Sequence, residues 1–304
     1  MIVFVTTAPY AYTHKKVLDA DPALRVEMWP YARIETTEAF PRATYILTDH
    51  DRLAVLVGRW AHAACDRMRA QGSIVLNDPV RVLTRAGLLR ALYLAGVNGF
   101  NAYRVEERVQ PERWPVFLRC EGDHLGPITG LLHGWDDVRR AIDSAVANGV
   151  PFASVIIVEY AAEPVRPGVF RKYSSFRVGR SAFAYNCVDD DQWIAKVGKM
   201  GITPDDLYEE EFRMIRDNPY GEVIARAFEI AGLDYGRADF GLVGGKPQIY
   251  EINSNPQIVF GDDHPSPIRQ RSYALMKKNY LAALRACDTA LGSAESAGPT
   301  TPGQ

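Results

Sequence analysis

Two neighbouring segments near the carboxyl end carry acidic and amide side chains among residues typical of buried strands. The first is Arg237-Ala238-Asp239-Phe240-Gly241, and the second is Tyr250-Glu251-Ile252-Asn253-Ser254-Asn255-Pro256. Gly244-Gly245 lies between them, so residues 237–243 and 248–253 are predicted to form the strands of a β-hairpin. Burying an unpaired carboxylate costs several kcal/mol. The hairpin therefore has to place its acids beside cations.

The register of this hairpin decides whether the acids meet. Side chains alternate along a strand, so Glu251 and Asn253 share one face, and Tyr250 packs on the other. Asp239 joins Glu251 only if the two are directly opposite, which needs an odd number of loop residues. A three-residue loop at 244–246 meets this need, whereas a two-residue turn would put Asp239 opposite Tyr250. We therefore expect the three-residue loop.

Asp239, Glu251 and Asn253 together offer oxygen ligands with no histidine or cysteine nearby. Such a set suits Mg²⁺, which binds few protein carboxylates and keeps positions for phosphate oxygens and water. The sequence thus predicts a magnesium site that works in phosphoryl chemistry. The alternative is that these acids only form ion pairs with Arg237 and Lys246.

The length and composition favour a globular protein of several lobes. The chain has 304 residues, of which 47% are apolar and 24% charged. One hydrophobic core rarely serves so long a chain, so two or three packed lobes are expected. Strand-like and helix-like segments alternate almost from end to end, which predicts a mixed α/β protein built of α+β lobes.

The charge and the cysteines exclude several classes of function. A net charge of −2 gives no reason to expect nucleic-acid or membrane binding, because both reward dense positive charge. Four scattered cysteines without a CxxC pair, and the lack of a signal peptide, indicate reduced thiols in a cytoplasmic protein. No apolar stretch approaches the roughly 18 residues of a spanning helix. Motifs of serine hydrolases, zinc proteases, P-loop enzymes and dinucleotide-binding folds are missing.

The pattern along the chain suggests where the lobes begin and end. Residues 1–76 are predicted to form a small open-sheet lobe, with strands at 2–5, 45–47 and 73–76 and a helix at 53–69. A lobe of two strands and one helix follows. The last residues, 292–304, are rich in Ser, Ala, Gly, Pro and Thr, which predicts a disordered tail.

At the hairpin the sequence resembles the ATP-grasp superfamily, whose members commonly end their catalytic lobe with Arg-x-Asp, a short hairpin and Glu-x-Asn followed by a turn. The order of elements across residues 77–265 also matches. The resemblance implies an ATP-grasp domain at 77–291, with a central nucleotide-clamping lobe at 107–160, after an N-terminal lobe at 1–76. The central lobe is β-rich, and the C-terminal lobe is catalytic.

The resemblance also implies roles for particular residues. Lys172 and Arg237 would act in catalysis, and Asp239, Glu251 and Asn253 would hold the metal. Residues that would bind the nucleotide come from a basic strand end, a glycine loop at 121–126, a hinge after a strand and a basic hairpin. They are Arg85, Arg119, Gly122, Gly126, Glu159, Tyr160, Ala161, Glu163 and Lys172.

Three positions depart from the family's pattern. Arg85 and Arg119 stand where relatives often carry lysine, and Ser174 stands where they often carry arginine. Arginine binds phosphate bidentately but is not equivalent to lysine as a point charge. Arg177 is the candidate to replace the missing cation.

The implied function is an ATP- and Mg²⁺-dependent ligase. It would activate a carboxylate, on a small molecule or a peptide, as an acyl phosphate that an amine or similar nucleophile captures. Two alternatives stay open: a small-molecule kinase that uses the same nucleotide site, and a non-catalytic nucleotide-binding protein. A homodimer is also compatible with the sequence.

Overall fold

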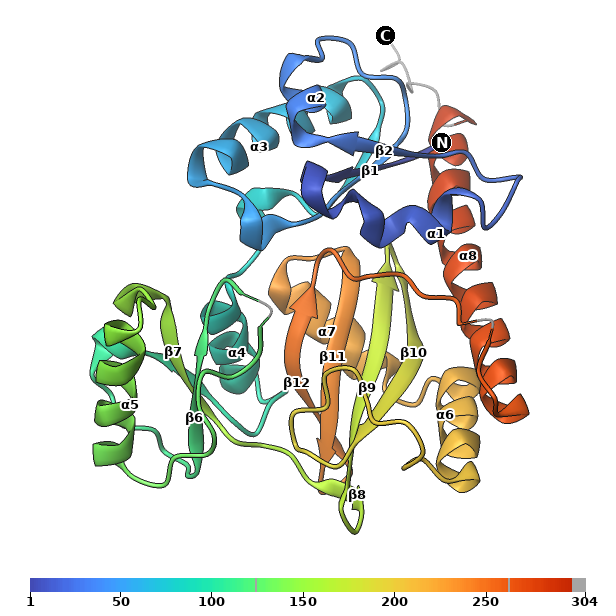
Figure 1. The fold of residues 1–304 in the computed structure, drawn as a ribbon. Helices are drawn as coiled ribbons and strands as arrows, with labels where there is room; N and C mark the ends of the chain where they lie inside the picture. The colour runs from blue at the N-terminus through green and yellow to red at the C-terminus, as the bar shows by residue number, and fades with distance from the viewer. Residues whose placement is uncertain (124, 262, 297–304) are drawn as a thin grey trace, which may run out of the picture.

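The N-terminal lobe is a small open sheet with helices on its faces (Figure 1). The computed structural model describes residues 1–123, 125–261 and 263–296. All strands of this sheet are parallel, in the order β2-β1-β3-β4. They are β1 (Ile2–Thr6), β2 (Val26–Pro30), β3 (Thr44–Leu47) and β4 (Ile74–Leu76). The helices of the lobe are η1 (Ala8–His14), α1 (Lys15–Leu18), α2 (Tyr31–Thr36), η2 (His50–Arg52) and α3 (Val55–Ala70). This confirms the predicted open-sheet lobe.

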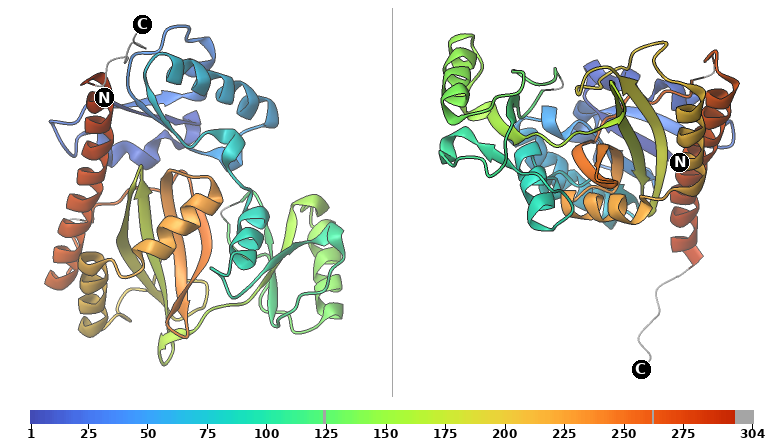
Figure 2. Two further views of the ribbon diagram at one scale, coloured as in Figure 1. Left: turned by 180° about the vertical axis from the view of Figure 1, so that it is seen from behind. Right: turned by 90° about the horizontal axis from the view of Figure 1, so that it is seen from below.

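The central lobe stands apart at one side of the molecule (Figures 1 and 2). Its antiparallel sheet has the order β5-β7-β6. The elements are β5 (Ala102–Arg104), η4 (Val105–Glu107), β6 (Val116–Cys120), α5 (Trp135–Ala147), η5 (Phe152–Ser154) and β7 (Val155–Glu159). The sequence predicted two strands and a start at residue 107. β5 is a third strand and lies ahead of that start; with three residues it is too short for a strand pattern to emerge.

The C-terminal lobe is built on an antiparallel sheet of order β10-β9-β11-β12, with β8 beside β9. Figure 2 shows α7 across the face of this sheet that is turned away in Figure 1, and α8 alongside both this lobe and the N-terminal one. The strands are β8 (Pro164–Arg166), β9 (Val169–Val178), β10 (Ser181–Asp190), β11 (Tyr235–Val243) and β12 (Lys246–Asn253). The helices are η3 (Pro79–Arg81), α4 (Arg85–Leu94), α6 (Asp205–Asp217), α7 (Gly221–Ala231) and α8 (Pro267–Ser296).

The β11–β12 hairpin corrects the predicted loop. Val243 pairs with Lys246, so the turn has two residues, and positive φ values of 55° and 75° at Gly244 and Gly245 suit the turn type that hairpins favour. Asp239 nevertheless lies opposite Glu251, because the register shifts directly after it. A β-bulge at Tyr250 supplies the odd residue that the prediction had placed in the loop.

Gly241 makes room for this bulge. A Cβ atom at position 241 would overlap the hydroxyl group of Tyr250. The same hydroxyl donates a hydrogen bond of 2.9 Å to the carbonyl oxygen of Ala161. The bulge therefore turns Tyr250 across Gly241 toward the nucleotide-side cleft described below, instead of the opposite face that alternation predicted.

The final helix is longer than expected. α8 reaches Ser296, so residues 292–296, which composition had assigned to a disordered tail, continue a helix. The rest of that predicted tail, 297–304, lies outside the described residues. In the described part of the chain, no helix has both the length and the apolar character needed to cross a membrane.

Candidate active site

A cleft with an open volume of about 1060 Å³ lies between the central sheet and the C-terminal sheet. Its walls are mostly apolar, with charged side chains among them, as is usual for small-molecule sites. Leu89, Phe100, Phe117, Val158 and Tyr250 supply apolar surface. Arg119, Lys172, Asp239 and Glu251 are among the charged residues of the lining. We call this the nucleotide-side cleft.

Asp239 is held by cations on the C-terminal sheet. The Nζ of Lys172 lies 3.2 Å from its Oδ2, and the Nε and Nη2 of Arg237 donate to its two oxygens at 2.8 and 3.1 Å. Ser174, which stands at one of the departures from the family pattern, donates a hydrogen bond of 3.1 Å to Oδ1. These contacts satisfy a carboxylate that is only 1% exposed.

Glu251 is held from the other side of the cleft. Arg85 donates to its Oε2 at 2.9 Å, and Arg119 lies 3.5 Å from the same oxygen. The ion-pair alternative from the sequence thus had the right kind of partner for Asp239 in Arg237. It was wrong about Lys246, which is exposed at the hairpin turn and forms no ion pair with these acids among the described residues.

The charges around the pair shift their proton affinities. Burial opposes ionisation of Asp239, but Arg237 and Lys172 outweigh it and lower the pKa of this carboxyl. Burial likewise opposes ionisation of Glu251, and Arg85 and Arg119 bring its pKa below the usual value. Burial, and then the like charge of Arg85, lower the pKa of Arg119. Both carboxylates are therefore ionised at neutral pH, beside more positive charge than they neutralise.

Asn253 is the third predicted metal ligand. It lies two residues after Glu251 on β12, opposite Arg237. Its Oδ1 accepts a hydrogen bond of 3.0 Å from the backbone N–H of Asn255. An amide oxygen has two lone pairs, so this bond leaves one for a cation.

Arg85 also shapes the glycine loop. Its Nη1 donates to the carbonyl oxygens of Cys120, Glu121 and Asp123 at 3.1, 2.8 and 2.9 Å. The guanidinium that was predicted to bind phosphate is thus engaged with the loop and with Glu251. Contact between Arg85 and a nucleotide stays a prediction.

The two glycines of that loop face different cavities. Gly126, with a φ of 108°, lines the nucleotide-side cleft, whereas Gly122 lines a second cleft. A Cβ at either position would meet nothing within 4 Å, so their backbone is open to a neighbouring ligand. His124, between them, lies outside the described residues.

The predicted hinge lies on the lining of the nucleotide-side cleft, but its acid is used internally. Glu159 is 1% exposed and accepts hydrogen bonds of 2.9 to 3.0 Å from Tyr103 and from the backbone of Asn101, Glu112 and Arg113. Tyr160 and Ala161 follow it along the wall. Glu163 accepts from the N–H of Gly244 at 2.9 Å and so caps the hairpin turn.

Arg177 does not replace the missing family cation. Its side chain donates to the carbonyl oxygens of Gly179 and Ala225, the second of which belongs to α7. Lys172 and Ser174 are an even number of residues apart on β9 and share the cleft face, whereas Arg177 is an odd number away and lies on the α7 face.

Several residues that line the cleft were not predicted from the sequence. Trp193 lies in the connection between β10 and α6, which had been read only as polar and acidic. Its ring is 4.9 Å from that of Phe117 and 5.5 Å from that of Tyr160. Lys196 follows it, and its carbonyl oxygen accepts from Lys172 at 3.4 Å. The one available signal was a tryptophan in an otherwise polar run.

The second cleft lies between the N-terminal lobe and the rest of the molecule, with an open volume of about 1800 Å³. Its lining includes His50 and Arg59 from the N-terminal lobe and Arg85, Glu251 and Asn253 from the C-terminal one. Glu251 lines both clefts. The two cavities therefore meet at the predicted metal site.

Comparisons with known proteins find similarity in structure only. No protein-family model and no curated protein matches the sequence. Among solved structures, D-alanine–D-alanine ligase from Bacillus anthracis is 10% identical, with 96% of this chain and 98% of that chain covered and a TM-score of 0.54. The ATP-grasp ligase PsnB, in complex with precursor peptide PsnA2 and AMPPNP, is 13% identical over 96% of both chains, with a TM-score of 0.53.

D-cycloserine synthetase DcsG is a third such neighbour, at 14% identity and a TM-score of 0.50, with 91% of this chain and 99% of that chain covered. The similarity in all three extends over nearly the whole length of both chains. At such low identities it establishes the fold and leaves the reaction open. It confirms the fold that the hairpin motif predicted.

Proposed function

We propose that this chain, which has the ATP-grasp fold, is an ATP-dependent ligase that joins a carboxylate to an amine. The observation that carries the proposal is the paired Asp239 and Glu251, ringed by four cations at the meeting point of two clefts. Two negative charges do not balance these cations. The surplus of positive charge favours a polyanionic ligand such as a triphosphate.

The lining of the nucleotide-side cleft is suited to both the adenine base and the phosphates of ATP. Its apolar wall, with Phe117, Trp193 and Tyr250, offers surface for a base, and Lys172 and Arg119, beside the paired acids, offer positive charge for phosphates. The backbone of Tyr160 and Ala161 would recognise the base, while the loop bearing Gly126 would cover the phosphates.

The residues present also fit magnesium. The donor set of Asp239, Glu251 and Asn253 consists of oxygens, and the two carboxylates face each other across the hairpin. Magnesium would be held by these three residues and would supply positive charge that neutralises phosphate oxygens. The ion pairs seen here do not conflict with this, because phosphate can take over Lys172 and the arginines as partners.

The reaction needs no side-chain nucleophile. A carboxylate oxygen of the substrate attacks the γ-phosphorus, the bond to ADP breaks, and an acyl phosphate forms. The amine then attacks the acyl carbon, phosphate leaves, and the amine loses a proton. Lys172 would offset charge on the transferring phosphoryl group, and Arg237 would offset charge on that group or on the tetrahedral oxyanion.

The second cleft would admit the carboxylate substrate, a small molecule or a peptide. This follows from the position of Glu251, which lines both cavities. A substrate in the second cleft and a phosphate in the first would meet beside this residue. The cytoplasmic location stays a prediction from the sequence, as does the absence of nucleic-acid and membrane partners.

The test is ADP release from ATP and Mg²⁺ with a panel of carboxylic acids, in the presence of hydroxylamine. Hydroxylamine converts an acyl phosphate to a hydroxamate, so a ligase releases ADP and forms hydroxamate together. Asp239→Asn should lower both about 100- to 1,000-fold. Asp191→Asn, the same change at an exposed acid in the β10–α6 connection, should leave them unchanged.

The two alternatives give different results. A small-molecule kinase would release ADP with a stable phosphorylated product and no hydroxamate. A non-catalytic protein would bind MgATP, with stabilisation of about 2.7 kcal/mol at 100 times the dissociation constant, and release no ADP with any acid. Either result would overturn the ligase proposal.

A further inference from the structure

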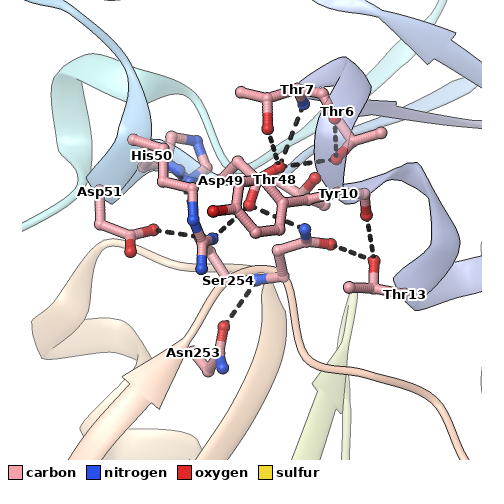
Figure 3. Close-up of polar contacts among 12 residues, drawn as sticks. Thr6, Thr7, Tyr10, Thr13, Thr48, Asp49, His50, Asp51, Asn253 and Ser254 are labelled. Atoms are coloured by element: carbon pink, nitrogen blue, oxygen red, sulfur yellow. Dashed lines mark hydrogen bonds and ion pairs between the residues drawn. The ribbon is translucent and has the colours of Figure 1, made fainter. Parts of the chain in front are cut away.

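The N-terminal lobe presents a polar edge to the predicted metal site. β1 and β3 are parallel neighbours, so their carboxyl ends lie at the same edge of the sheet. Thr6 is the last residue of β1 and Thr7 follows it, while Asp49 comes two residues after the end of β3. Figure 3 shows these residues beside Asn253 and Ser254, which come from the end of β12. Segments some 200 residues apart in the sequence, at positions 50 and 254, are in hydrogen-bond contact there.

Asp49 is the centre of this edge. It has no exposed surface, and its carboxylate accepts five hydrogen bonds. The Oδ2 atom accepts hydrogen bonds from the hydroxyl groups of Thr6 and Thr7, both at 2.7 Å, and from the N–H of Thr7 at 3.1 Å. The Oδ1 atom accepts hydrogen bonds from Nη1 of Arg52 at 2.5 Å and from Nδ2 of Asn255 at 2.7 Å.

Asn255 connects this carboxylate to the metal site. Its side chain lies between the two lobes: Nδ2 donates to Asp49, and Oδ1 accepts from Thr13 at 2.7 Å. Its backbone N–H donates to Oδ1 of Asn253 at 3.0 Å. The oxygen predicted to bind magnesium is thus oriented by a residue that Asp49 holds.

The local geometry indicates a fixed arrangement. Asp49 has a φ of 59° and a ψ of 31°, a left-handed conformation that residues other than glycine seldom adopt. Its partner Arg52 stacks over the ring of Tyr10 at 4.0 Å. The backbone conformation and the stacked arginine aim both carboxylate oxygens at their donors.

We infer that Asp49 is a positioning residue for the proposed magnesium site, and that it sets the orientation of Asn253 through Asn255. The inference rests on the proposed function, because it needs a cation at Asn253. It gives the N-terminal lobe a part in nucleotide binding besides lining the second cleft. Groups that orient metal ligands typically change metal affinity 10- to 100-fold when they are replaced.

The test is nucleotide affinity by calorimetry, with and without MgCl₂, using AMPPNP as the probe. The readout is the ratio of the two dissociation constants. Asp49→Asn places an NH₂ group against a donor whichever way the amide turns, so it breaks the network without changing size. We expect the ratio to fall about 10-fold or more, with the magnesium-free affinity unchanged within about twofold.

Two further variants separate positioning from folding. Asn255→Ala breaks the same connection from the other lobe while Asp49 keeps Arg52 and both threonines, and it should lower the ratio as much. Asp78→Asn is the matched control, because Asp78 is a buried acid near the N-terminal lobe that pairs with Arg69 and forms no hydrogen bond or ion pair with residues 253–255 among the described residues. It should keep the native ratio.

The outcomes are distinct. If magnesium strengthens binding to the native protein and Asp49→Asn and Asn255→Ala keep that ratio, the inference is wrong and the proposed function stands. If magnesium leaves the native affinity unchanged, the metal part of the proposed function fails, and the inference fails with it. Loss of magnesium-free affinity in step with the ratio would indicate a general structural role and would also overturn the inference.

Discussion

Neighbouring residues on β9 belong to two different clusters of charge. The Arg171 side chain lies in a buried cluster, where it contacts Asp189 at 2.6 and 2.7 Å and where Glu211 pairs with Arg269; the half-buried Glu210 lies 3.8 Å from Arg171 at the edge of this cluster. Lys172 lies in the cleft cluster with Asp239 and Glu251. Apart from Glu210, the buried cluster has two cations and two acids, whereas the cleft cluster has four cations and two acids.

This difference in charge distinguishes a cluster that stabilises the fold from one that can bind a ligand. A buried ion pair roughly offsets its own desolvation cost, so a balanced cluster needs no further partner. An excess of positive charge beside an open cleft is stable only because a mobile anion can approach it. The number of charges and the access to solvent, rather than burial alone, distinguish the two clusters. The following changes test the distinction, from the largest expected effect to the smallest.

Arg171→Met should be the most destabilising. The Arg171 side chain is 1% exposed, and removing it leaves Asp189 buried without its charge partner, which costs about 3–5 kcal/mol. Urea unfolding measures the loss. The double variant Arg171→Met/Asp189→Leu should recover most of it, because a buried pair replaced by apolar side chains is often neutral. Equal losses in the single and double variants would contradict the balanced-cluster interpretation.

Lys172→Met should instead weaken nucleotide binding and barely change stability. Asp239 keeps Arg237 and Ser174 as partners, so the folded state loses little. A charged hydrogen bond to phosphate contributes about 1.5–3 kcal/mol, which corresponds to about 10- to 100-fold in the dissociation constant for MgATP. Calorimetry measures it. A large loss of stability with unchanged affinity would mean that Lys172, like Arg171, stabilises the fold and does not bind the nucleotide.

Trp193→Ala should have a smaller effect on the same affinity. The tryptophan contacts Phe117 and Tyr160 at the apolar wall, and such aromatic contacts contribute about 0.5–1.5 kcal/mol. MgATP should bind about 2- to 10-fold more weakly. Phe152→Ala removes an exposed ring on the central lobe that lines neither cleft and should leave the affinity unchanged.

The smallest effects concern pH, because burial and ion pairing oppose each other in both clusters. The pKa of Asp239 is lowered from 3.8, so its stabilisation is complete above that value and is lost as the pH falls through the folded-state pKa. Burial raises the pKa of Glu211 above 4.5 despite Arg269, so its ionised form costs stability as the pH rises through the folded-state pKa.

Urea unfolding across pH 2–7 separates these two acids. Asp239→Asn should flatten the loss of stability below about pH 4, and Glu211→Gln should remove the gain that wild type shows on acidification toward pH 4.5. If the two variants show the same dependence of stability on pH, the pKa values of Asp239 and Glu211 are not shifted in opposite directions, and the prediction is wrong.

Much of the fold followed from local pattern. The helix at residues 221–231 begins and ends where its apolar spacing and Gly232 predicted, since both signals lie within the helix or directly after it. α6 was not predicted: in the sequence its 13 residues merge with an acidic run, and only packing shows that Leu207, Met214 and Ile215 form one buried face.

By itself the sequence determined which acids the two strands of the hairpin carry, and it predicted that Asp239 and Glu251 face each other, because two buried acids in one hairpin need cations between them. Only the tertiary structure decided how this is reached. The bulge at Tyr250 depends on room over Gly241 and on an acceptor at Ala161, about 90 residues away. The contact between Asp49 and Asn255 joins residues 206 positions apart. A local pattern carries no information about such partners, since their meeting depends on how whole lobes pack.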